Sequence, residues 1–150
     1  MRGRDALITD LLLETGFRLD DIMNLRVWQA VGNQISIRER KTGKLRAVSL
    51  PSVLAEDIKT YAGNRHRFCF LFPALRVYGA KKMHRTTYWR HFMAAVRAAG
   101  CGGRGYSPHS LRKVYAVRLF EKCGNLFQVQ ADLNHTHLST TMLYALADRI

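Results

Sequence analysis

The sequence lacks any long apolar run, and none of its hydrophobic stretches approaches the ~20 residues that a membrane-spanning helix needs. Its start, MRGRDALITD, does not read as a signal peptide, because the apolar stretch that follows is broken at Glu14 and Gly16. Internal repeats, low-complexity tracts and Pro/Ser-rich linkers are missing as well. These absences argue against a membrane partner and against a chain of several domains.

Cysteine is scarce. Cys69, Cys101 and Cys123 are an odd number at wide spacing and include no CxxC pair, which favours a reduced chain with incidental thiols over a disulfide framework. A zinc site formed by Cys123, His135 and His137 is an alternative, but its spacing fits no standard zinc pattern. We therefore expect neither a metal nor another cofactor.

Acidic residues are few compared with basic ones. The chain has 24 Lys and Arg against 11 Asp and Glu, which gives a formal net charge of +13. Self-repulsion on this scale lowers stability, so such a charge is typical of a protein that meets a polyanion. Nucleic acid is the expected partner, and an anionic membrane surface is the second candidate.

Apolar residues are present in ordinary proportion, and their spacing predicts mostly helices. With 47% hydrophobic and 23% charged residues, the 150-residue chain can bury one core. The apolar residues of the first segment follow helical spacing up to Gly16, which is a plausible C-cap. A second helix is expected to start at Asp20 or Asp21. Further helices are predicted for residues 51–62, from Thr86 or Thr87 to Gly100, for residues 108–123, from about 126 onward, and around Tyr144 with Ser139 as its cap.

One segment changes its period. Ile35 and Ile37 alternate with polar residues, and the alternation resumes after Thr42-Gly43, as in a β-hairpin. The segment RFCFLFPA, residues 67–74, is expected to be a short buried strand or an extended stretch. The predicted class is therefore α+β, mainly α-helical with a small antiparallel β-sheet.

Six polar residues stand out because together they could act on a phosphodiester. A phosphodiester under attack spreads negative charge over its non-bridging oxygens, and the planar guanidinium of Arg matches that charge. His can hydrogen-bond and move a proton near neutral pH, and Lys can protonate a departing alkoxide. A Tyr phenol becomes a nucleophile when its proton is removed or its anion is stabilised by cations. The six are Arg18, Lys41, His109, Arg112, His135 and Tyr144.

Each of the six has an ordinary explanation when it is taken alone. Arg18 fits a solvated residue at a helix end, and Lys41 fits a charged turn. The two histidines fit polar positions at a turn and at a helix start. A lone Tyr is more often a core aromatic with its hydroxyl at the rim. Their joint occurrence favours a functional set.

The order and spacing of these residues resemble the catalytic domain of tyrosine recombinases, the phage integrase family. The resemblance covers the whole chain, so residues 1–150 are expected to form one catalytic domain. The matching segments are TGFRLDD with Arg18 and Asp21, RKTGKLRAVSLP with Lys41, HSLR with His109 and Arg112, and LNHTHLSTTMLY with His135 and, nine residues later, Tyr144.

The resemblance implies a site-specific DNA recombinase that cuts and rejoins strands without metal or ATP. Tyr144 is then the nucleophile that forms a 3′-phosphotyrosyl link. Arg18 and Arg112 are implied to clamp the scissile phosphate, and Lys41 is the implied general acid for the 5′-hydroxyl leaving group.

The remaining positions are implied to support this chemistry. His109 is a general base or hydrogen-bond partner, and His135 binds a phosphate oxygen. Asp21 falls on a supporting acidic position that is expected to orient a catalytic Arg. Asn134 departs from the usual Gly before the second His. Because Asn tolerates a left-handed conformation, we expect the turn to survive.

The family also implies partners and a location. The substrate is double-stranded DNA, and the full-length enzyme acts as a homo-tetramer on two DNA sites in the cytoplasm, associated with the nucleoid, of a prokaryotic or phage-infected cell. An N-terminal DNA-clamp domain is expected to be absent from this chain. Two alternatives remain open: a non-catalytic DNA-binding module, and a type IB topoisomerase or telomere resolvase relative.

Overall fold

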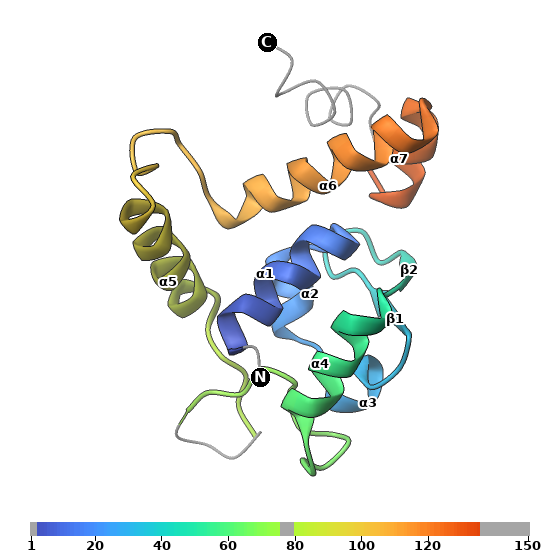
Figure 1. The fold of residues 1–150 in the computed structure, drawn as a ribbon. Coiled ribbons are helices and arrows are strands. Elements are labelled where there is room, and N and C mark those ends of the chain that lie inside the picture. Colours follow the sequence, from blue (N-terminus) through green and yellow to red (C-terminus); the bar gives the residue numbers. More distant parts are fainter. Residues whose placement is uncertain (1–2, 76–79, 136–150) are drawn as a thin grey trace.

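The computed structural model describes residues 3–75 and 80–135 and shows helices arranged around a small antiparallel sheet (Figure 1). The predicted α+β class, mainly helical, is confirmed. No helix in these two ranges is long and apolar enough to span a bilayer. The elements in chain order are α1 (Arg4–Thr15), α2 (Leu19–Met23), α3 (Val27–Ala30), β1 (Gln34–Arg38), β2 (Leu45–Ser49), α4 (Ser52–Ala62), α5 (Arg85–Ala98), α6 (Pro108–Cys123) and α7 (Leu126–Asp132).

The hairpin predicted from the alternating pattern is confirmed. β1 and β2 pair antiparallel, with Ile35 opposite Val48, and Lys41 lies in the turn that joins them. Burial alternates along β1, so Ile35 and Ile37 point into the core. Glu39, two residues beyond Ile37, continues this alternation and is also fully buried.

Helix ends follow local signals, with two differences from the prediction. α1 and α6 end where glycines adopt left-handed conformations, at Gly16 and Gly124. α2 starts at Leu19, earlier than expected, because the extended residue Arg18 serves as its N-cap. α5 starts at Arg85, because the His84 side chain accepts a hydrogen bond from the Thr86 amide and so acts as the cap.

Residues 67–74 form a turn followed by isolated bridges, so the short buried strand or extended stretch expected for this segment is not present as one continuous element. Phe70 forms an isolated bridge with Arg26, and the amide of Leu71 donates to the carbonyl of Leu25 at 2.8 Å. The segment thus passes beside the chain between α2 and α3, where it brings Leu71 into the core.

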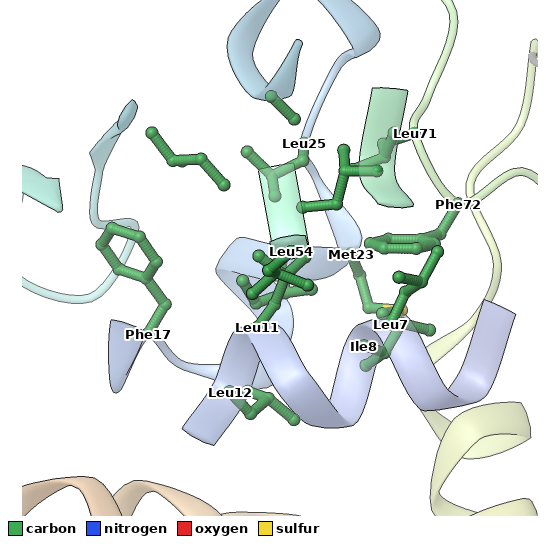
Figure 2. Close-up of a cluster of buried hydrophobic side chains, with 14 of the residues drawn as sticks. Leu7, Ile8, Leu11, Leu12, Phe17, Met23, Leu25, Leu54, Leu71 and Phe72 are labelled. Carbon is green, nitrogen blue, oxygen red and sulfur yellow. The ribbon is translucent and has the colours of Figure 1, made fainter. Parts of the chain in front are cut away.

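The main core forms around α1, which packs against both α4 and α6 (Figure 1). Apolar residues lie on more than one face of α1, so Leu7, Ile8, Leu11 and Leu12 are all buried. Figure 2 shows these side chains in a cluster with residues as distant in sequence as Phe72. Because α1 sits in this core, the chain that leaves its C-terminal end is held in place.

Candidate active site

Four of the six predicted residues line one cavity of about 520 Å³. They come from three separate parts of the chain: the connection between α1 and α2, the hairpin turn, and the first turns of α6. Trp89 and Arg85 of α5 line the cavity as well. The four predicted residues are Arg18, Lys41, His109 and Arg112.

Arg18 is placed by the end of α1. Gly16 has φ 62°, a conformation that Gly adopts without strain, and the next residue, Phe17, is fully buried. Arg18 follows in an extended conformation. Its guanidinium forms an ion pair with Glu39, and its side chain remains 20% exposed. The guanidinium is therefore tethered at the wall of the cavity and is still accessible.

Glu39 is a member of this site that sequence reasoning missed. Its carboxylate is fully buried and accepts hydrogen bonds from Arg18 and, at 3.2 Å, from the Asn134 amide. A signal for it did exist. The β1 alternation that turns Ile35 and Ile37 inward makes Glu39 the next inward position, and a charged residue there must be paired.

Lys41 and Asp21 meet at the hairpin turn. Lys41 is exposed and lines the cavity, while the buried Asp21 carboxylate accepts a hydrogen bond from the backbone amide of Arg40 at 3.0 Å. Burial raises the pKa of Asp21 against the lowering effect of that hydrogen bond, and the nearby Glu39 charge raises it further. The expected role of Asp21 in orienting a catalytic arginine stays a prediction. The charges of Arg18 and Arg112 act on its carboxylate, and its hydrogen bond also holds the backbone next to Lys41.

Arg112 joins two parts of the site. It lies on α6 and is 1% exposed. One terminal nitrogen donates to the Gly16 carbonyl, and the other donates to the Leu133 carbonyl at 2.7 Å. Gly16 precedes Arg18 by two residues, and Leu133 precedes His135 by two. The guanidinium therefore fixes the spacing of these two segments while it lines the cavity.

His135 follows α7 in a tight turn. Asn134 has φ 51°, the left-handed conformation expected for a residue in place of Gly, and the His135 amide donates to the Gln130 carbonyl at 3.0 Å. Burial, then the charges of Arg112 and Arg18, lower the pKa of His135 to about 4. This histidine is therefore neutral at pH 7.

His109, in the first turn of α6, is exposed and lines the cavity. Desolvation by the surrounding protein, followed by repulsion from Arg112 and Lys113, lowers its pKa. The imidazole is thus mainly neutral at pH 7, as a proton acceptor or hydrogen-bond partner must be.

Two candidate residues lie outside the described residues, namely Tyr144 and His137, the latter part of the zinc alternative. Within residues 3–75 and 80–135, no three His, Cys, Asp or Glu side chains come together as a metal site would require. Four of the six predicted residues line the cavity, and the turn that carries His135 is linked to it through the Leu133–Arg112 and Asn134–Glu39 hydrogen bonds. Two arginines, a lysine and two histidines with lowered pKa values suit a phosphate group.

Comparison with known families finds a match along almost the whole chain. A family model described as the phage integrase family matches residues 2–149. Among curated proteins, the chain is 32% identical over 144 residues to tyrosine recombinase XerA of Pyrococcus furiosus, across 94% of this chain and 49% of that protein. The chain thus spans about half the length of the curated relatives it matches.

Solved structures have a similar fold. A crystal structure of XerA recombinase superposes with a TM-score of 0.77 at 23% identity, and covers 95% of this chain and 51% of its own. The XerH site-specific recombinase bound to its difH substrate before cleavage superposes with a TM-score of 0.76 at 23% identity, across 94% of this chain and 42% of its own.

Proposed function

The chain belongs to the phage integrase family, and from that premise we propose that it is the catalytic domain of a site-specific tyrosine recombinase that cleaves and rejoins double-stranded DNA. The observation that carries the proposal is the single cavity lined by Arg18, Lys41, His109 and Arg112. These four residues reach the cavity from segments far apart in the sequence, and a phosphodiester is the group that such a set of donors and cations fits.

The proposed reaction exchanges one phosphoester for another. The Tyr144 phenolic oxygen bonds to phosphorus at the scissile phosphate, and the bond from phosphorus to the 5′ oxygen of the next nucleotide breaks. Lys41 gives a proton to the departing 5′ oxygen, and the Tyr144 proton passes to a neutral base, the role we propose for His109. The 3′-phosphotyrosine ester keeps the energy of the broken ester, so a 5′-hydroxyl can reverse the step without ATP.

The two arginines supply the charge stabilisation in this scheme. Arg18 and Arg112 face a phosphate whose non-bridging oxygens gain negative charge as the nucleophile attacks. His135, neutral because its pKa is lowered to about 4, offers a hydrogen bond to one of those oxygens without adding a further positive charge. Asp21 acts indirectly, by holding the turn that carries Lys41.

The proposed substrate follows from charge as well as from the site. The formal charge of +13 suits a DNA backbone, and the relative XerH is described as bound to its difH substrate. We propose that the full-length protein acts as a homo-tetramer on two DNA sites in the nucleoid region of the cytoplasm. Residues 1–150 are proposed to be the catalytic domain alone, with the DNA clamp supplied by a segment outside them.

A covalent trap tests the proposal. The protein is mixed with a pool of nicked duplexes that carry a randomised central sequence, from which the cut fragment diffuses away, and adducts are resolved on a denaturing gel. Wild type should form a protein–DNA adduct and Tyr144→Phe should form none. Tyr61→Phe, a change of the same chemistry at a half-buried position away from the cavity, should form the adduct normally.

Equal absence of adduct in wild type and in Tyr144→Phe would contradict the enzymatic proposal. If both then still bound DNA, the alternative of a non-catalytic DNA-binding module would take its place. Adduct formation on duplexes of every sequence, followed by relaxation of supercoils without strand exchange, would favour a type IB topoisomerase relative.

A further inference from the structure

The carboxylate of Glu39 lies behind the cavity and contacts two elements of the proposed active site. It is fully buried, and a buried carboxylate is stable only when its oxygens are paired. One oxygen, Oε2, accepts from the Arg18 guanidinium, and the other, Oε1, accepts from the Asn134 side-chain amide at 3.2 Å. The two partners lie 21 and 95 positions away in sequence.

The backbone around Glu39 is fixed independently of these contacts. Its amide donates to the Lys44 carbonyl at 2.9 Å, and its carbonyl accepts from the Gly43 amide at 2.8 Å. These bonds close the hairpin turn. The carboxylate therefore starts from a rigid base, and it can hold the two side chains that reach it instead of following them.

Asn134 has a conformation that few side chains tolerate. Among the described residues it is the one non-glycine with positive φ, at 51°. Glycine would adopt this conformation without strain, so a side chain at this position is unfavourable for the backbone unless it makes a compensating contact. The hydrogen bond to Glu39 is such a contact.

We propose that Glu39 is a positioning residue for Arg18. We also propose that Asn134 positions the His135 turn by bonding to the same carboxylate. The inference rests on the proposed function and extends it. Arg18 would hold the scissile phosphate in an orientation set by the Oε2 atom of Glu39. His135, which contacts the same phosphate, would be positioned through the Oε1 atom of Glu39. Neither Glu39 nor Asn134 would touch DNA.

The simpler possibility is that these contacts only stabilise the fold, and the two roles differ in their coupling to Arg18. A positioning residue acts through Arg18, so its loss should matter little once Arg18 is gone. A purely structural residue should add its defect to that of any other variant. Coupling between the two substitutions is thus the decisive measurement.

The test uses single-turnover cleavage of a saturating amount of a nicked duplex recovered from the trapping pool, at a temperature where every variant is folded. Glu39→Gln keeps the shape of the side chain and removes its charge, and it should slow cleavage by about 10- to 100-fold. In the Arg18→Ala background, Glu39→Gln should cause a much smaller loss, because only the contact with Asn134 is then left to change. Glu56→Gln, the same change at an exposed site on α4, should leave the rate unchanged.

Asn134→Gly is the second variant, because it removes the amide and at the same time relieves the backbone. It should slow cleavage by about fivefold with unchanged DNA affinity, since the phosphate clamp is displaced and not removed. Asn33→Gly, at an exposed position before β1, is the matched control.

Moving the negative charge from position 39 to position 134 gives a more specific test. Asn134→Asp should be slower than Asn134→Gly, because it places a second carboxylate against Glu39. The double variant Glu39→Gln/Asn134→Asp returns a single negative charge to the pair and should recover part of the rate.

The outcomes separate the two proposals. If wild type forms no adduct, the proposed function is lost and the positioning role is lost with it. If wild type cleaves and both Glu39→Gln and Asn134→Gly cleave at its rate, the positioning role alone is overturned. The positioning role is also overturned if Glu39→Gln slows cleavage by the same factor in the Arg18→Ala background as in wild type, because Glu39 would then act only on the fold.

Discussion

The two halves of the proposed active site are held in place by different forces. The half with Arg18 and Lys41 rests on α1 and the hairpin, inside a large cluster of buried apolar residues. The half with Arg112 and His135 belongs to α6 and α7, whose described residues form a second and much smaller buried cluster. That cluster consists of Ala116, Val129 and Leu133, with Tyr115, Leu119 and Phe120 packed against it.

Polar contacts take the place of apolar area in the second half. Arg112 bonds to the carbonyls of Gly16 and Leu133, and Asn134 bonds to Glu39. Hydrophobic burial is non-directional, whereas hydrogen bonds to a charged group are directional and strong. The comparison teaches that the first half contains most of the buried apolar core, and that oriented polar contacts add to the packing of α6 on α1 in aligning the second half.

Of the changes that test this comparison, removal of the Arg112 guanidinium is expected to lower the free energy of unfolding most. Arg112→Met should lower the free energy of unfolding by about 3–5 kcal/mol, because two buried carbonyls lose a charged donor. Denaturant unfolding measures this change, and the covalent trap should show at least a ~100-fold loss of adduct. Arg118→Met, at an exposed position of the same helix, should be close to neutral. An Arg112→Met protein as stable as wild type would show that apolar packing alone holds α6.

A closely matched pair of glycines gives the next effect. Gly16 and Gly124 both end helices in the left-handed conformation, with φ of 62° and 63°. A Cβ at Gly16 would overlap the Tyr115 ring of α6, whereas a Cβ at Gly124 would meet no atom within 4 Å. Gly124→Ala should therefore cost about 1 kcal/mol and Gly16→Ala about 2–4 kcal/mol. Thermal unfolding of the two variants checks this; equal costs would mean that α6 does not pack closely on the end of α1.

The third effect concerns pH and rests on His135. Its pKa is lowered from 6.5 to about 4 in the folded chain. Above pH 6.5, His135 is neutral in both the folded and the unfolded chain, so it does not lower the free energy of unfolding. That free energy falls as the pH drops from 6.5 towards 4, because in this range only the unfolded chain takes up the proton. The loss should reach about 3 kcal/mol at most.

The variant that checks this slope is His135→Asn. It should flatten the decline of unfolding free energy between pH 6.5 and 4, but not abolish it, since the pKa of His109 is lowered too. Asp21 acts in the opposite direction, because its raised pKa favours the folded state as pH falls. A variant with the wild-type slope would contradict the assignment to His135.

Much of the fold could be predicted from the sequence because its signals are local. The hairpin followed from alternation around Thr42-Gly43, and the bounds of α6 followed from Ser107-Pro108 and Gly124. The start of α5 was missed, because His84 caps the helix with its imidazole and His is not a residue that usually signals a cap.

The site could be predicted in its residue types but not in its connections. The spacing of the motifs identified Arg18, Lys41, His109, Arg112 and His135. The structure brings the first four to one cavity and ties the His135 turn to it through Arg112 and Glu39. It did not reveal Glu39, whose surroundings in the sequence, RERK, read as a charged turn. It also assigned Arg112 to the phosphate alone, although two of its nitrogens bond to backbone carbonyls.

The sequence by itself determined the hairpin, the chemical types of the site and the described helices other than the short α3, because periodicity, caps and motif spacing depend on residues a few positions apart. Only the tertiary structure decided that Arg112 reaches Gly16 across 96 positions and that Asn134 reaches Glu39 across 95. Such contacts depend on where α6 and α7 come to lie on α1 and the hairpin. That placement results from packing and from the need to pair every buried charge, neither of which is recorded in any short stretch of sequence.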